Sequence, residues 1–136
     1  MAAARPQVLA LVVCDAVHRD PSTGKHTLLG CFSALTSRMF PAVHPTVAVY
    51  AAITEGYGQA LMEMRLVRPD GVQVLQRLSA EVRFDDPRTV VELAFTLTNV
   101  TFPVPEETRV QLLADGELLL ERRLRVVGVR SDAKDA

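Results

Sequence analysis

The stretch CDAVHRDPSTGKHTLLGCF, residues 14–32, concentrates cysteine, histidine and aspartate side chains around a Gly-Lys pair. These residue types could hold a transition metal, and Gly24-Lys25 invites comparison with a phosphate-binding loop. Such a loop requires a glycine five residues before Gly24 and a serine or threonine directly after Lys25. The chain has Arg19 and His26 at those positions, which excludes the motif.

A zinc site in the same stretch is limited by distance. Zinc ligands lie about 2.0 to 2.3 Å from the ion. On an extended strand Cys14 and His18 would stand roughly 13 Å apart. We therefore expect a structural hairpin and no bound metal. If the hairpin closes around Ser22 and Thr23, Cys14 falls opposite Cys31, as either a buried thiol pair or a disulfide.

The remaining polar residues do not form a catalytic motif. His44 stands between Pro41 and Pro45, which predicts a rigid connecting loop with the histidine facing solvent. No serine, cysteine or histidine lies in a recognisable nucleophile motif. The sequence therefore predicts no catalytic residue, no cofactor and no enzyme activity.

Aspartates in predicted turns offer an alternative site. Asp85 and Asp86, with Asp20 or Asp70, could supply oxygen ligands to calcium if their loops shared one end of the fold. Aspartate is also common in turns for a reason unrelated to metals, because its carboxylate bonds to nearby backbone N–H groups. Calcium or small-molecule binding is therefore the alternative function.

Length and composition limit the class of protein. The chain has 136 residues, 49% of them hydrophobic, which suits one domain over residues 1–136 with frayed ends at 1–6 and 130–136. A net charge of −1 predicts neither nucleic-acid nor membrane binding. The two cysteines are too few for a disulfide scaffold, and the short apolar run near the N-terminus makes a poor signal peptide. We expect a cytoplasmic protein.

These side chains must be positioned by strands, which period-two alternation predicts along most of the chain. Between residues 72 and 84 the even positions are mostly apolar and the odd positions mostly polar. The same pattern predicts about eight strands, near residues 8–17, 26–35, 47–53, 60–68, 72–84, 91–98, 109–113 and 118–127. No helix of ordinary length is predicted. This spacing is typical of an all-β fold, a two-layer antiparallel β-sandwich of immunoglobulin-like or C2-like type.

The alternation also predicts the core and two hairpins. The expected core is Met62, Met64, Leu66, Val74, Leu78, Val82, Leu93, Phe95, Leu97, Leu112, Leu118, Leu120 and Leu124. Around Asp70-Gly71 and Asp115-Gly116, a two-residue loop would place one apolar set on the wrong face, so we expect three-residue loops. These loops pair Leu66 with Val74 and Met64 with Gln76, and they pair Leu112 with Leu118 and Val110 with Leu120.

Several of these features together resemble an uncharacterised family of small bacterial proteins. They are Cys14-Asp15 after an apolar strand, Gly24-Lys25 before Leu28-Leu29-Gly30-Cys31-Phe32, Phe40-Pro41 with His44-Pro45, and residues 114–118. The resemblance spans nearly the whole chain and implies a β-sandwich of immunoglobulin-like or C2-like type. It implies no activity and no catalytic residue.

The favoured function is a non-enzymatic interaction or structural module. Apolar residues on otherwise polar faces motivate it, namely Leu61, Val67, Leu75, Leu119 and Val127, because a contiguous patch would mark an interface. Scattered single exposures are the alternative interpretation. We expect a homodimer through the hairpin of residues 109–127, with Leu113, Leu119, Arg123 and Val127 as interface residues and the monomer as the alternative.

Overall fold

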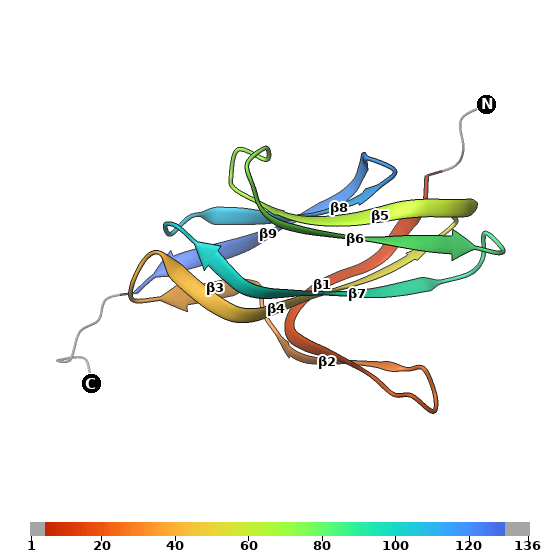
Figure 1. Ribbon diagram of the computed structural model, residues 1–136, viewed down its shortest axis with the longest axis horizontal. Coiled ribbons are helices and arrows are strands. Elements are labelled where there is room, and N and C mark those ends of the chain that lie inside the picture. Colours follow the sequence, from red (N-terminus) through yellow and green to blue (C-terminus); the bar gives the residue numbers. More distant parts are fainter. Residues whose placement is uncertain (1–4, 130–136) are drawn as a thin grey trace.

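The computed structural model describes residues 5–129, which form nine β-strands and contain no helix (Figure 1). The strands are β1 (Gln7–Arg19), β2 (His26–Cys31), β3 (Ala34–Ser37), β4 (Ala42–Thr54), β5 (Gly58–Val67), β6 (Val74–Phe84), β7 (Val91–Phe102), β8 (Glu107–Ala114) and β9 (Glu117–Gly128). Within these residues there is accordingly no helix of the length and apolarity that crossing a bilayer requires. Residues 1–4 and 130–136 lie outside the described part, and with them most of the predicted frayed ends.

The strands form two layers. Sheet A has the order β2-β1-β4-β7, and sheet B has the order β3-β9-β8-β5-β6. The prediction of an all-β antiparallel sandwich is confirmed, with one exception in the pairing, because β3 runs parallel to β9. The single strand expected over residues 26–35 is instead two strands. The chain crosses from sheet A to sheet B at Phe32-Ser33, between β2 and β3.

The core lies between the two sheets. From sheet A it receives odd-numbered residues of β4 such as Val47, Val49 and Ile53, and from sheet B even-numbered residues of β5 such as Met62 and Met64. Most of the predicted core is buried: Met62, Met64, Leu66, Val82, Phe95, Leu97, Leu112 and Leu124. Leu93 is half-buried and packs against the same core.

Four predicted core residues are exposed instead. Val74 and Leu78 are 39% and 38% exposed, and Leu118 and Leu120 are each 42% exposed. The physical reason is their place in the sheet. The first pair lies on β6, the outermost strand of sheet B, and the second lies on the part of β9 beyond its pairing with β3. Leu78 and Leu120 pair with the buried Met64 and Leu112 and face inward, but a side chain at a sheet edge has neighbours on one side only. Val74 and Leu118 pair with Val67 and Leu113 after a register shift, which places them on the outer face of sheet B.

The predicted pairing at the first hairpin is wrong by two residues. Leu66 pairs with Gln76 and Met64 with Leu78, so the loop covers residues 68–73. The Arg68 N–H donates to the Gln73 carbonyl at 2.8 Å, and Asp70 Oδ1 accepts from the N–H groups of Val72 and Gln73. The aspartate thereby builds a wider loop than a three-residue turn, and a shift of two residues leaves the apolar set from Gln76 onward on its original face. Beside the loop a bulge at Leu75 places Val74 opposite Val67.

The second hairpin also differs from the prediction. Asp115 and Gly116 form a two-residue turn with φ of 48° and 82°, and Ala114 pairs with Glu117. Leu113 pairs with Leu118 and Leu112 with Leu120, which leaves Leu119 as an extra residue. A bulge inside β9 therefore corrects the register that a three-residue loop was expected to correct.

Candidate functional site

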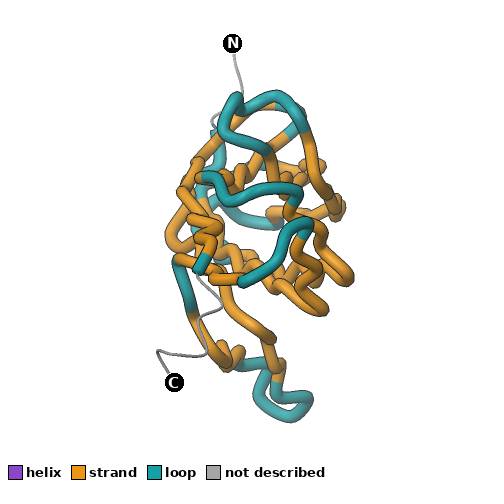
Figure 2. Tube along the Cα trace, turned by 90° about the vertical axis from the view of Figure 1, so that its left-hand side faces the viewer, coloured by secondary structure: helices purple, strands orange, loops and turns teal. Residues whose placement is uncertain are grey.

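The first hairpin leaves the sandwich as an arm. β1 pairs with β4 only as far as Cys14, and from Cys14 to Arg19 it pairs with β2. We call residues 14–31 the arm hairpin. It bends away from sheet A and projects from the body of the molecule (Figures 1 and 2). The strand prediction for this stretch is confirmed, and the structure gives the hairpin a direction that the pattern does not contain.

The two cysteines lie at the base of the arm hairpin. Cys14 pairs directly with Cys31, the arrangement expected of a hairpin closed around Ser22 and Thr23. Both thiols are free, Cys14 fully buried and Cys31 exposed. The Cys14 Sγ donates to the Ala16 carbonyl at 3.4 Å. Burial raises the pKa of the Cys14 thiol, and the neighbouring Cys31 raises it further.

Gly30 allows the strands to approach closely beside this pair. Its φ is +67°, a conformation that glycine adopts without a steric penalty. A Cβ at this position would lie 2.3 Å from Asp15 Oδ2 and 3.2 Å from the Asp15 Cβ. Glycine is therefore required next to Cys31 by both the backbone conformation and the space.

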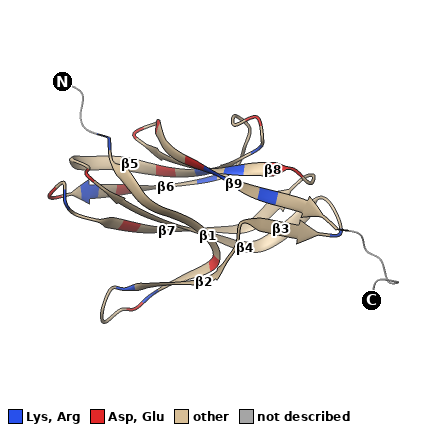
Figure 3. Ribbon diagram, turned by 180° about the vertical axis from the view of Figure 1, so that it is seen from behind, with Lys and Arg blue, Asp and Glu red and all other residues tan. Residues whose placement is uncertain are grey.

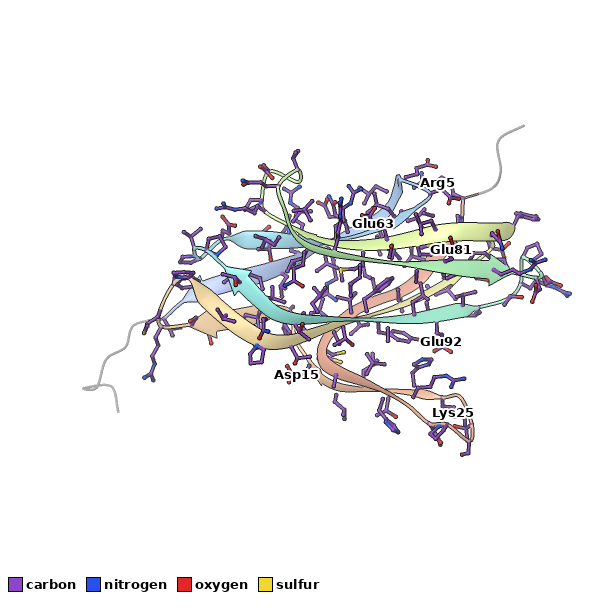
Figure 4. All side chains as sticks on the ribbon, viewed as in Figure 1. Arg5, Asp15, Lys25, Glu63, Glu81 and Glu92 are labelled. Atoms are coloured by element: carbon purple, nitrogen blue, oxygen red, sulfur yellow. The ribbon has the colours of Figure 1, made fainter. Side chains whose placement is uncertain are left out.

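A cluster of polar aromatic and acidic groups joins the far end of the arm hairpin to sheet A. His26 Nδ1 lies 3.1 Å from Glu92 Oε2, and the Tyr50 hydroxyl donates to the same oxygen. The rings of His26 and Tyr50 lie 5.5 Å apart. Figure 4 shows Glu92 between β7 and the hairpin. No sequence pattern indicates this cluster, because its members come from three strands distant in sequence.

His44 is not in a solvent-facing loop, which corrects that prediction. It lies within β4, is half-buried, and its ring packs 6.1 Å from that of Phe32. Pro45 does not break the strand because β1 stops pairing with β4 at Ala48, so only β7 lies beside β4 at that point. Proline is tolerated in such one-sided positions. His44 also lines a hollow of only about 70 Å³ near Phe102 and Val126.

The four aspartates proposed for calcium do not meet. Asp70 follows β5 and precedes β6, whereas Asp85 and Asp86 follow β6, so they lie at opposite ends of one strand. Asp20 is near the tip of the arm hairpin. Each has a local partner: Asp20 accepts from Ser22, Asp70 from Val72 and Gln73, Asp85 from Arg83, and Asp86 from Arg88. Among the residues described, no group of three metal-ligating side chains converges.

Charged side chains cover the outer face of sheet B. Glu63 pairs with Arg65 at 2.9 Å, and Arg109 pairs with Glu121 at 3.1 Å. Figure 3 shows acidic and basic residues interspersed along these strands. Their long aliphatic stems cover apolar residues on this face. On the same face Leu113, between Glu63 of β5 and Leu118 of β9, is only 4% exposed, which corrects its assignment as an interface residue, and Val67 is only 1% exposed.

The other proposed interface residues have different positions. Leu119 packs against the core, as does Leu75, so the prediction that these two face outward is wrong. Val127 is half-buried opposite Thr36 of β3. Arg123 is exposed and pairs with Glu107 at 3.0 Å. Of the predicted outward apolar residues, Leu61 is clearly exposed, at 46%.

A different apolar surface lies where the edges of the two sheets meet. Arg122 Nη1 donates to the Leu11 carbonyl at 3.0 Å, and Arg5 pairs with Glu117 at 3.4 Å. These two contacts place the first half of β1 alongside the first half of β9. Exposed leucines lie on these two segments: Leu9 of β1 at 54%, and Leu118 and Leu120 of β9 at 42% each. We call this surface the β1–β9 side.

Comparison with known proteins identifies relatives without an assigned activity. A family model described as a family of unknown function (DUF6941) matches residues 9–127. No curated protein matches the chain. Among solved structures, the chain is similar to an immunoglobulin-like protein from Pseudomonas aeruginosa, with 13% identity and a TM-score of 0.40. The match covers 93% of this chain and 99% of that chain.

Proposed function

This chain belongs to that family of unknown function, and we propose that it is a non-enzymatic interaction module that binds a second copy of itself through the β1–β9 side. One observation carries the proposal. Leu9 on β1 of sheet A and Leu118 and Leu120 on β9 of sheet B are all half-exposed, and the two strand segments that carry them lie side by side. Apolar side chains gathered in this way favour a protein contact, whereas single scattered ones carry no such meaning.

The charges around these leucines support a two-fold contact. Glu117 and Arg123 lie at either end of this part of β9, and both side chains are more than half exposed. In a two-fold symmetric dimer the same surface of both copies meets, and the two β9 strands run in opposite directions. Glu117 of one copy can then lie near Arg123 of the other, which favours self-association over stacking in one direction.

The strand edges at this side support a contact through side chains rather than the addition of a strand. The Arg5 guanidinium donates to the Leu118 carbonyl of β9, and the Arg122 guanidinium donates to the Leu11 carbonyl of β1. Both edges therefore have carbonyl groups already satisfied by arginine. Charged groups at sheet edges discourage open-ended strand pairing. We expect exposed leucines on these two adjacent segments to support a closed dimer of modest affinity.

The proposal that the module is non-enzymatic is supported by the contacts that its polar side chains already make within the fold. The aspartates complete turns or local ion pairs, and His26 contacts Glu92. The cysteine pair is consistent with a reducing compartment, so we place the protein in the cytoplasm.

Sedimentation of the full chain at micromolar concentration tests the dimer. We expect the wild type to be dimeric and Leu120→Arg to be monomeric, because the arginine places a charge at the centre of the contact. Leu29→Arg is the matched control, since Leu29 is 51% exposed on the arm hairpin, away from β9. It should leave the dimer intact. Leu119→Arg is less informative, because Leu119 packs against the core.

Two results would refute this assignment. One is a wild type that sediments as a monomer across the micromolar range. The other is a dimer that survives Leu120→Arg but dissociates in Leu29→Arg, which would move the contact to the arm hairpin.

A further inference from the structure

The base of the arm hairpin carries a second property, independent of the proposed dimer. Cys14 and Cys31 are direct partners on antiparallel strands. The Cα atoms of such partners are about 4.5 to 5.5 Å apart, and disulfides span Cα separations of about 4.4 to 6.8 Å. Partners also project to the same face of a sheet. The backbone is therefore already placed for a disulfide between these residues.

The two thiols differ in their access to solvent. Cys14 has no exposed surface, whereas Cys31 is exposed. A dissolved oxidant can reach the Cys31 sulfur directly but cannot reach that of Cys14. Oxidation must then begin at Cys31, with Cys14 as the group that completes the reaction. Redox-sensitive cysteine pairs commonly combine an accessible cysteine with a nearby resolving one.

We propose that Cys14 and Cys31 form a peroxide-responsive pair that closes to a disulfide at the base of the arm hairpin. The Cys31 thiolate attacks one oxygen of hydrogen peroxide, and the O–O bond breaks. The products are a Cys31 sulfenic acid and hydroxide, which is protonated to water. The Cys14 thiolate then attacks the Cys31 sulfur. The S–S bond forms as the S–O bond breaks, and hydroxide leaves and is protonated to a second water. The two thiols are oxidised and the peroxide is reduced.

The position of the pair determines what the disulfide would change. Cys14 is the last residue of β1 to pair with β4 and the first to pair with β2. A covalent bond there links β2 to the strand that enters the sandwich. Since β2 has no other strand neighbour in the described part of the chain, the bond restrains the arm hairpin at the point where it leaves sheet A.

Peptide mapping under non-reducing conditions tests the proposal on the full chain treated with hydrogen peroxide. We expect a peptide linking Cys14 to Cys31, lighter by two hydrogen atoms than the reduced pair. Closure should accelerate as pH rises, because burial holds the Cys14 thiol in its protonated form. Amides of the arm hairpin should exchange more slowly in the oxidised protein, while those of β5 and β8 stay unchanged.

Single substitutions separate the two roles. In Cys14→Ser, the sulfenic acid on Cys31 has no resolving thiol and should be trapped by dimedone. In Cys31→Ser, Cys14 should stay unmodified while the protein is folded, which circular dichroism checks. The proposal is overturned if the wild type gives a dimedone adduct on Cys31 without the internal disulfide. It is equally overturned if peroxide produces only Cys31-to-Cys31 links between chains.

Discussion

The His26 imidazole and the Glu92 carboxylate, 3.1 Å apart, connect β2 of the arm hairpin to β7 on the far edge of sheet A. The Tyr50 hydroxyl donates to the same carboxylate oxygen from β4. One carboxylate thus joins three strands. This contact links the outer part of the arm hairpin to sheet A.

Removing the carboxylate should loosen the arm hairpin without unfolding the sandwich. A partly exposed polar contact of this kind contributes about 0.5 to 1 kcal/mol, so Glu92→Gln should make local opening roughly two- to five-fold more frequent. Hydrogen exchange of amides in residues 17–28 would report this change. Glu81→Gln alters an exposed carboxylate of β6 and is the control. Equal exchange in both variants would mean that Glu92 does not hold the hairpin.

Tyr50 should make the fold sensitive to alkali. Burial, together with Glu92, raises the pKa of Tyr50 from 10.0 to about 12. The unfolded chain therefore loses this proton at lower pH than the folded chain. The stabilising contribution of neutral Tyr50 is complete below about pH 10 and is lost as pH rises toward about 12.

Denaturant unfolding over this pH range checks the contribution of Tyr50. Tyr50→Phe should show a shallower decline in the free energy of unfolding than the wild type, because phenylalanine has no proton to lose. Tyr57→Phe, at a residue that is 60% exposed, should keep the wild-type slope. Parallel declines for the wild type and Tyr50→Phe would show that the Tyr50 proton is not coupled to folding.

Two truncations should separate core from edge. Phe95 is 4% exposed between the sheets, so Phe95→Ala should cost about 3 to 5 kcal/mol through lost burial and the cavity left behind. Leu78→Ala removes a side chain that is 38% exposed on β6, and it should cost less than about 2 kcal/mol. Chemical denaturation measures both values. A larger loss for Leu78→Ala would mean that β6 is covered in solution.

A single added methyl group at Gly56 should overpack the core. Gly56 is buried, and a Cβ there would lie 2.4 Å from the Phe84 ring. Gly56→Ala should therefore destabilise the protein by about 1 to 3 kcal/mol. If the clash with Phe84 is the cause, adding Phe84→Leu should cost less in the alanine variant than in the wild type. Strictly additive effects would assign the loss to the backbone.

The sequence by itself determined the class of fold and most of its interior. Alternation with a period of two is a local property, because successive side chains of any strand point to opposite faces. It therefore identified Met62, Met64 and Phe95 as core residues without reference to strand order. The sequence placed Cys14 opposite Cys31 only on the condition that the hairpin closes around Ser22 and Thr23, since the register of a hairpin follows from where it closes, and the structure has this pairing.

Only the tertiary structure decided which inward-facing residues are covered. Leu78 and Leu120 fit the core pattern but lie at sheet edges, and Leu113 fits the surface pattern but is buried on β8, between β9 and β5. The carboxylate of Asp70 and the bulge at Leu119 set the two hairpin registers through local contacts that alternation does not encode. The cluster of His26, Tyr50 and Glu92 required three distant strands to meet, because burial and contact depend on neighbours that are remote in sequence.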